Sequence, residues 1–275
     1  MKHTHPAIPD PPPGPTDFGG ADAASDAGGA NPVLQRLKAE IRQIEHGRRG
    51  ALRAVLPFDI ASLDAHLPDG GLVQGALHEV MGGGADLVHG AAAALFIAGI
   101  VARLGGTVLW CLTRRDLFAP GLAAAGLDPG RVIHAEAGND AAVLLAMEEG
   151  LRHPGLAAVV GEVRRLPMTA SRRLQLAAET SGVTAFALHR WPRLPPGGVV
   201  PVEPSAGVTR WQVAAAPGPG GDLRRALWRV SLQRCRAASP SEWLLEACDA
   251  QGRLAVPAQL ADRPVAAERD LRRVA

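Results

Sequence analysis

A glycine-rich turn within Gly82 to Ala94 is the stretch whose residue types come closest to nucleotide chemistry. It follows an apolar run, Leu77 to Met81, and precedes a long apolar segment, Val88 to Leu104; their lengths and patterns predict a strand and a helix. A strand, a glycine-rich turn and a helix in this order form the phosphate-binding loop of many nucleotide-binding proteins. The sequence therefore predicts a turn with the shape of a phosphate cradle.

The side chains of this turn lack the chemistry of a phosphate-binding loop. When Gly90 is aligned with the second glycine of G-x-x-x-x-G-K-[ST], Ala91 replaces the lysine and Ala92 replaces the hydroxyl that binds Mg²⁺. A methyl group neither neutralises a phosphate nor ligates a metal. Three further glycines keep the turn open, namely Gly82, Gly83 and Gly84.

Anion binding through the main chain is a separate question. N–H groups at the start of a helix attract anions whatever the side chains are. Weak nucleotide binding therefore stays open as an alternative, although Asp86 brings a negative charge into the turn. The favoured interpretation is a turn that keeps its shape and holds no cofactor.

Two groups of arginines are the second set of candidate binding residues. Two pairs follow the apolar run Leu156 to Val160, namely Arg164-Arg165 and Arg172-Arg173. Guanidinium groups suit phosphates, so we interpret these pairs as DNA contacts, with a solvated helix face as the alternative. A second group contains Arg224, Arg225, Trp228 and Arg229. Alternation puts Trp228 and Arg229 on opposite strand faces, and such a mixed surface favours a protein partner over nucleic acid.

Composition limits the remaining classes of function. The 275 residues are 47% hydrophobic and 20% charged with a net charge of +2, which indicates a globular protein with no need for a polyanionic partner. No metal site is predicted, because the histidines show no i,i+4 pairing and the three cysteines are widely spaced. The N-terminus lacks a signal-peptide core, and the 16 uncharged residues 87–102 are too few to span a membrane. We expect a cytoplasmic protein.

The hydrophobic pattern predicts the elements that position these residues. Residues 1–30 are rich in proline and glycine and are predicted to be disordered. Residues 31–55 contain a predicted helix whose apolar seam docks in cis or on a partner. Residues 56–195 alternate strands with helices, which predicts an α/β fold with a mainly parallel sheet flanked by helices. Residues 196–275 alternate polar and apolar positions, which predicts an antiparallel β-rich extension and a frayed tail.

The segment from Leu56 to Val80 carries a resemblance to a known family. It reads Leu-Pro, Ser-Leu-Asp, Leu-Pro-Asp-Gly-Gly-Leu and His-Glu-Val in order, before the glycine turn and the long helix. This pattern resembles the start of the RecA-type ATPase core, and the likeness extends to Trp191. The degenerate turn, with the later Trp-Arg-Val, Arg-Cys-Arg and Trp-Leu-Leu-Glu-Ala-Cys-Asp-Ala-Gln-Gly-Arg-Leu, resembles the ImuA family. That family comprises RecA-like accessory proteins of bacterial damage-induced mutagenesis.

The RecA resemblance implies two acidic positions besides the phosphate-binding loop, and both are altered. Two arginines and Asp116 follow the predicted strand Thr107 to Leu112, so only Asp116 could replace the water-activating glutamate. The predicted strand Leu156 to Val160 runs into Gly161 and Glu162, where the carboxylate comes one residue late as a degenerate Walker B motif. With the loop side chains also lost, the sequence predicts a pseudo-ATPase.

The resemblance implies an accessory role. ImuA proteins act with a polymerase-like partner, ImuB, and an error-prone polymerase in an SOS-induced lesion-bypass assembly. We therefore expect a non-catalytic adaptor that links an ImuB-type partner to RecA or to damaged DNA, with self-association left open. Two alternatives remain: a divergent RecA-like ATPase that acts on DNA, and a cell-division inhibitor of the SulA type.

Overall fold

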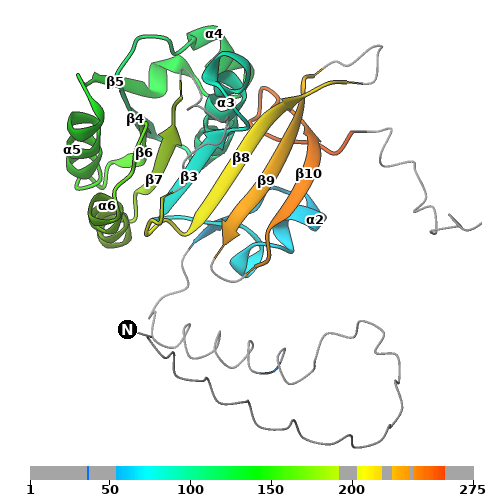
Figure 1. Ribbon diagram of the computed structural model, residues 1–275, viewed down its shortest axis with the longest axis horizontal. Helices are drawn as coiled ribbons and strands as arrows, with labels where there is room; N and C mark the ends of the chain where they lie inside the picture. Colours follow the sequence, from blue (N-terminus) through cyan, green and yellow to red (C-terminus); the bar gives the residue numbers. More distant parts are fainter. Residues whose placement is uncertain (1–35, 37–53, 192–202, 219–224, 236–237, 258–275) are drawn as a thin grey trace, which may run out of the picture. The chain divides into compact units, whose positions relative to one another are not determined.

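The computed structural model describes residues 36, 54–191, 203–218, 225–235 and 238–257 of the chain (Figure 1). The chain divides into two compact units, Met1–Leu52 and Arg53–Ala275. The predicted N-terminal tail lies outside the described residues. In the predicted helical segment 31–55, Arg36 is helical, whereas Val55 belongs to the first strand of the second unit.

Eight strands form one sheet in the order β10-β9-β8-β3-β7-β6-β4-β5. The strands are β3 (Leu77–Gly82), β4 (Thr107–Leu112), β5 (Val132–Glu136), β6 (Leu156–Val163), β7 (Thr184–His189), β8 (Thr209–Ala216), β9 (Leu227–Cys235) and β10 (Ser241–Glu246). Every neighbouring pair from β8 to β5 is parallel, whereas β8–β9 and β9–β10 are antiparallel. The predicted mainly parallel sheet with a C-terminal antiparallel extension is therefore confirmed. A small separate sheet pairs β1 (Val55–Leu56) with β2 (Leu72–Val73).

Helices flank the large sheet (Figure 1). They are α2 (Ala61–Asp64), α3 (Asp86–Leu104), α4 (Ala119–Ala124), α5 (Asp140–Gly150) and α6 (Met168–Ser181), with short 3-10 turns η1 (Pro68–Gly70) and η2 (Pro129–Arg131). Successive strand residues point to opposite faces. In β6, Val159 packs in the hydrophobic cluster of α5 and α6, whereas Val160 packs in the cluster of α3. The central strands are thus buried on both faces, as their mostly apolar sequences predict.

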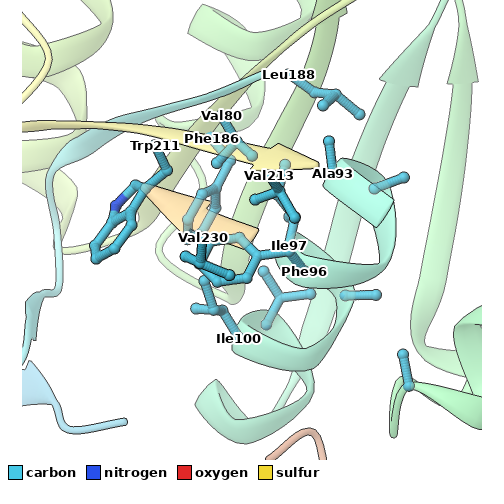
Figure 2. Close-up of a cluster of buried hydrophobic side chains, with 14 of the residues drawn as sticks. Val80, Ala93, Phe96, Ile97, Ile100, Phe186, Leu188, Trp211, Val213 and Val230 are labelled. Atoms are coloured by element: carbon cyan, nitrogen blue, oxygen red, sulfur yellow. The ribbon is translucent and has the colours of Figure 1, made fainter. Parts of the chain in front are cut away.

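Helix α3 lies at the centre of the larger hydrophobic cluster (Figure 2). The ring of its Phe96 lies 5.7 Å from that of Trp211 in β8 and 6.1 Å from that of Phe58, measured between centroids. The helix is long and apolar enough to cross a membrane, but 56% of its apolar window is buried inside the fold. Because α3 follows β3 directly, its first turn lies at the carboxyl ends of the parallel strands, where open α/β folds bind ligands.

Candidate functional site

The turn after β3 is shorter than a phosphate-binding loop. Strand β3 ends at Gly82 and α3 begins at Asp86, so only residues 83–85 connect them. Gly90 therefore lies inside α3, more than one turn from the first helical residue. The structure corrects the alignment that placed Gly90 at the end of the loop.

The alanines of that alignment also belong to the body of the helix. Ala91 is exposed and Ala92 is buried, and neither lies in the first turn of α3. The predicted helix start at Val88 is two residues late, because Ala85 at the N-cap makes no side-chain hydrogen bond and so gives no capping signal in the sequence. The first turn holds Asp86, two apolar residues and His89, with no lysine or hydroxyl.

Close packing explains the three glycines of the turn. None of them adopts a φ in the left-handed region. A Cβ atom at Gly83 would lie 2.4 Å from the Cβ of Ala214 in β8, which is too close for two carbon atoms. Cβ atoms at Gly82 and Gly84 would approach the His89 side chain to 3.1 and 3.0 Å. Neighbouring protein atoms therefore account for these glycines without a phosphate.

Directly after β7, the side chain of Arg190 lies among three carboxylates. Its Nη1 is 2.6 Å from Glu162 Oε2, its Nη2 is 2.7 Å from Asp116 Oδ2, and its Nε is 2.9 Å from Asp86 Oδ2. The acids come from β6, from the segment after β4 and from the first turn of α3. The structure thus brings the two carboxylates singled out in the sequence together, but around a guanidinium group. In the described part of the chain, no group of acids, histidines and cysteines is arranged to hold a metal ion.

Backbone hydrogen bonds join the same segments. The Asp86 N–H donates to the Trp191 carbonyl oxygen at 3.0 Å, and the Trp191 N–H donates to Asp86 Oδ1 at 3.0 Å. A Cβ at Gly90 would lie 3.1 Å from the Asp86 Cβ and 3.4 Å from its Oδ1, so Gly90 leaves room for this carboxylate. The N-terminus of α3 therefore carries a negative charge of its own, where a phosphate-binding helix offers N–H groups to an anion.

Glu162 is the most deeply buried acid of the cluster, with 3% of its side chain exposed. Trp110 Nε1 donates to its Oε1 at 3.0 Å, while its Oε2 accepts from Arg190. Burial raises the pKa of the Glu162 carboxyl above its ordinary value, against the opposing effects of Arg190 and Trp110. Burial alone would lower the pKa of Arg190, but the neighbouring carboxylates have the larger opposite effect, so the pKa of Arg190 is raised above its ordinary value. The guanidinium group therefore stays charged and is the counter-ion of the buried acid.

Strand β6 continues past its predicted end at Val160 to Val163, so Gly161 and Glu162 lie inside the strand. Charged residues are rarely buried unless they are paired, and the partners of Glu162 are distant in the sequence. A Cβ at Gly161 would lie 2.1 Å from the Met147 Sδ of α5. Gly161 is thus required by the packing of a helix on the sheet.

A second buried network centres on Glu79 of β3, which is 1% exposed. Arg210 Nη2 donates to both carboxylate oxygens at 3.0 Å, and His189 Nε2 lies 3.0 Å from Oε2. The Ser205 hydroxyl donates to Oε1, and Arg234 Nη2 lies 3.3 Å from the same oxygen. Burial would raise the pKa of Glu79, but these hydrogen bonds and the charges of His189 and Arg210 lower it to about 2.

Sequence reasoning missed Arg190 and the network of Glu79. The sequence did contain a signal, because Glu79 interrupts a strand whose other residues are nearly all apolar, and Arg190 follows an apolar strand. In the structure, the neighbours His189 and Arg190 reach different acids, Glu79 and Glu162. The end of β7 thus connects both networks.

The paired arginines after β6 and on α6 are exposed. The backbone N–H groups of Arg164 and Arg165 both donate to Asp140 Oδ2, at 3.0 and 3.1 Å, which fixes the turn between β6 and α6. Arg173 Nε lies 3.3 Å from Glu148 Oε2 of α5, while Arg172 is exposed on the same helix as Arg173. Their guanidinium groups face solvent, and their contact with DNA stays a prediction.

The predicted mixed surface of arginine and tryptophan is wrong for Trp228. This residue is 3% exposed and belongs to the core, because the apolar face of β9 packs against α3 and its neighbours. Arg229 is exposed on the opposite face, as the alternation predicts, and lies 3.5 Å from Glu242. Arg225 lies 2.6 Å from Glu246. Arg224 lies outside the described residues.

Comparison with known proteins shows the family to which the chain belongs. No protein-family model matches the chain. The chain is 42% identical over 226 residues to Protein ImuA of Caulobacter vibrioides (strain NA1000 / CB15N), which covers 78% of this chain and 93% of that protein. The same values hold for Protein ImuA of Caulobacter vibrioides (strain ATCC 19089 / CIP 103742 / CB 15).

Among solved structures, the crystal structure of the RadB recombinase superposes with a TM-score of 0.52 at 15% identity, over 73% of this chain and 99% of that chain. This likeness shows the fold alone, a RecA-like sheet flanked by helices. Sequence identity over most of both chains shows the family. The chain therefore belongs to the ImuA family of RecA-like proteins related to DNA-damage-induced mutagenesis.

Proposed function

We propose that the protein is a non-hydrolysing RecA-like adaptor, which links an ImuB-type polymerase-like partner and an error-prone polymerase to RecA or to damaged DNA. One observation carries the non-hydrolysing part: the charged side chain of Arg190 fills the space between the acids at the carboxyl ends of the strands. Membership of the ImuA family supports the adaptor part.

Nucleotide binding is opposed by the charges at this position. A triphosphate at the start of α3 would meet the Asp86 carboxylate and would compete with it for Arg190. Separating Arg190 from Glu162 leaves a buried acid without its counter-ion, and breaking such a buried pair costs about 3–5 kcal/mol. The Asp86 N–H already donates to Trp191. The protein therefore supplies its own acceptor at the start of α3, where a nucleotide-binding fold uses the phosphate oxygens of the ligand.

Hydrolysis is opposed by the pairing of the acids. A general base must be free to accept a proton from water. Asp116 and Glu162 are both ion-paired to Arg190, at 2.7 and 2.6 Å. No lysine is present in the first turn of α3 to neutralise the transferred phosphate.

The DNA side of the proposal is supported by the exposed arginines of the β6–α6 region. Arg164, Arg165 and Arg172 present guanidinium groups to solvent, and such groups suit phosphate contacts. This surface would be an auxiliary contact, because a net charge of +2 does not indicate a protein dominated by nucleic-acid binding.

Two measurements test the proposal. The purified protein, titrated with a fluorescent ATP analogue and Mg²⁺, is expected to show no saturable binding at millimolar nucleotide, with RecA as the positive control. Saturable binding with phosphate release would support a divergent ATPase instead. The tagged chain, captured from damage-treated cells of its own host, is expected to bring down an ImuB-type protein or RecA.

Absence of both partners from the captured material contradicts the adaptor role. Overexpression distinguishes the remaining alternative, because a SulA-type inhibitor blocks division and causes filamentous growth. We expect overexpressing cells to divide normally in the absence of DNA damage.

A further inference from the structure

A small cavity is lined by residues of three neighbouring strands. Strands β7, β3 and β8 lie side by side (Figure 1), and they contribute His189, Glu79 and Arg210. Each of these residues has a strand neighbour in the hydrophobic cluster of α3, namely Leu188, Val80 or Trp211. Because successive strand residues point to opposite faces, the three side chains point away from α3. The cavity is separate from the cluster of Arg190, none of whose members lines it.

The cavity has a volume of about 10 Å³, which is room for one water-sized group. The turn after β6 borders it with Arg164 and Arg165, which are both exposed, so the cavity is reached from the solvent side of this turn. A ligand can therefore place a single oxygen atom inside and keep its remaining atoms among the exposed arginines.

Two buried nitrogen atoms of the lining residues have no hydrogen-bond partner in the described part of the chain, namely His189 Nδ1 and Arg210 Nε. Their side chains are only 9% and 8% exposed. Buried polar atoms are nearly always hydrogen-bonded, because burial without a partner is costly. Two such atoms on residues that line one cavity point to a ligand that enters it.

The two atoms specify the chemistry of the entering group. Arg210 Nε always donates, because a guanidinium group keeps its protons. His189 Nε2 donates to the Glu79 carboxylate, so His189 Nδ1 accepts when the ring is neutral and donates when the ring is charged. A hydroxyl both donates and accepts, and it therefore suits the two atoms in either state of the ring.

The buried end of the cavity carries more positive than negative charge. The carboxylate of Glu79 is shared by two arginines, because Arg210 Nη2 lies 3.0 Å and Arg234 Nη2 lies 3.3 Å from its Oε1. One carboxylate thus faces two guanidinium groups. An anionic ligand would balance the remaining charge.

The mouth of the cavity adds a cation that is available to a ligand. Arg165 lies 3.7 Å from Glu203, and Asp140 accepts from the backbone N–H groups of Arg164 and Arg165. The side chain of Arg164 has no ion pair among the described residues. Two arginines and two acids balance at the mouth, so the excess positive charge of the buried end remains.

We propose that this cavity binds a phosphate group with a free O–H, whose hydroxyl oxygen bonds Arg210 Nε and His189 Nδ1 while Arg164 pairs with the charged oxygens. Inorganic phosphate and the terminal phosphate of a DNA strand share this chemistry, because both keep an ionisable proton near neutral pH. The phosphodiesters of a DNA backbone lack that proton. The inference goes beyond the adaptor role and does not depend on it.

Inorganic phosphate tests the proposal when it is titrated into the full chain at about pH 7, with sodium chloride holding the ionic strength constant. Trp191 lines the cavity and its ring stacks on that of His189, 5.4 Å between centroids, so its fluorescence reports occupancy. We expect a saturable change that Trp191→Phe removes, with a rise in the unfolding temperature. A response no larger than that to chloride overturns the proposal, because the cavity then takes only water.

Matched variants place the binding in the cavity. Arg164→Glu is expected to weaken phosphate binding by about tenfold or more. Arg115→Glu, at an arginine whose side chain is 83% exposed and does not line the cavity, should leave binding unchanged. Arg210→Lys keeps a cation beside Glu79 but lacks the Nε–H, and it is also expected to weaken binding by about tenfold or more.

Equal losses in Arg164→Glu and Arg115→Glu overturn the assignment to the cavity, as does unchanged binding in Arg210→Lys. Thermal unfolding of each variant shows whether the fold is retained. Arg164 is exposed, so its substitution keeps the test decisive even where Arg210→Lys unfolds.

Oligonucleotides identify the source of the phosphate. One thymidine oligonucleotide with a 5′-phosphate and one with a 5′-hydroxyl compete with inorganic phosphate for the full chain. Displacement by the phosphorylated strand alone supports a DNA strand end, and displacement by neither supports free phosphate. Equal displacement by both would show that backbone phosphodiesters fill the cavity, which overturns the assignment of a free O–H.

The same variants keep this site distinct from nucleotide binding at the start of α3. An ATP analogue bound through the cavity would lose affinity in Arg164→Glu, whereas an analogue bound beside Asp86 would not, because Asp86 does not line the cavity. Absence of phosphate binding overturns the cavity proposal and leaves the nucleotide and partner-capture tests of the adaptor role unaffected.

Discussion

The guanidinium group of Arg190 and the carboxylate of Glu162 meet at 2.6 Å although 28 residues separate them in the chain. This pair fastens the end of β7 to β6. Asp86 and Asp116 extend the connection to α3 and to the segment after β4. One side chain therefore holds together the ends of four elements.

Arg190→Ala should be strongly destabilising, because it leaves Glu162 buried without a counter-ion. We expect the free energy of unfolding in urea to fall by about 3–5 kcal/mol, and by less for Arg190→Lys, which keeps the charge but loses the planar fork. Arg152→Ala is the control, because its side chain, 62% exposed, pairs with Glu149 at the surface. That variant should lose about 1 kcal/mol or less. Equal losses for Arg190→Ala and Arg152→Ala would contradict the role given to Arg190.

The double variant Arg190→Ala/Glu162→Gln should be more stable than Arg190→Ala alone. Glutamine removes the unpaired buried charge and keeps an acceptor for Trp110 Nε1, which now donates to Glu162 at 3.0 Å. A double-mutant cycle measured by urea unfolding should give a coupling of about 1–3 kcal/mol. Additive losses would show that the two residues do not act as a pair.

Gly83→Ala should destabilise the protein by about 1–3 kcal/mol through overpacking. The added Cβ would lie 2.4 Å from that of Ala214, so Ala214→Gly in the same chain should restore most of the loss. Gly155→Ala serves as the control, because nothing lies within 4 Å of a Cβ at that position. Thermal unfolding of the four proteins provides the measurement, and a Gly83→Ala protein as stable as Gly155→Ala would refute the packing explanation.

Stability should fall in acid as Glu79 takes up a proton. The folded state lowers the pKa of Glu79 from 4.5 to about 2, so its contribution is complete above pH 4.5 and is lost as the pH falls towards 2. The pKa difference corresponds to about 3 kcal/mol. Burial also lowers the pKa of His78, from 6.5 to about 4. The unfolded chain therefore takes up a proton at His78 first, and the stability that His78 contributes is lost at higher pH, as the pH falls from 6.5 towards 4.

Glu79→Gln should flatten the lower part of this pH profile only. Urea unfolding of both proteins between pH 2 and pH 7 gives the comparison, and the window follows from the pKa of Glu79. If the substituted protein loses stability below pH 4.5 as steeply as the original, the network of Glu79 does not control this transition.

Ala91→Lys/Ala92→Thr should not create an ATPase. Both positions lie beyond the first turn of α3, and Asp86 and Arg190 would still occupy its start. We expect phosphate release at the level of the unsubstituted protein, measured with Mg²⁺ and ATP beside RecA. Turnover that depends on the two substitutions would show that the site accepts a nucleotide.

The sequence predicted the order of strands and helices well, because the central strands are mostly apolar and are buried on both faces. The Asn139 side chain caps α5 by accepting from the Ala142 N–H at 3.0 Å, and such a cap depends only on residues that are neighbours in the sequence. The true start of α3 was missed because Ala85 provides no such cap. Local signals thus predicted local structure.

The site was predicted less well because its contacts are long-range. Glu162 was identified as a displaced carboxylate, but its partner Arg190 joins the cluster only when β6 and β7 pair side by side. Trp228 was placed on the correct strand face, yet the sequence does not tell which face is covered by a helix. Pairing and burial depend on the tertiary fold, which the spacing of residues in one chain does not specify.

The reciprocal bonds between Asp86 and Trp191 tie the first residue of α3 to the second residue after β7. An engineered nucleotide site at this helix start would have to break these bonds, add a lysine and remove Arg190, and the last change alone would leave Glu162 buried without its counter-ion. Stabilising substitutions elsewhere in the chain would therefore have to come before any such redesign.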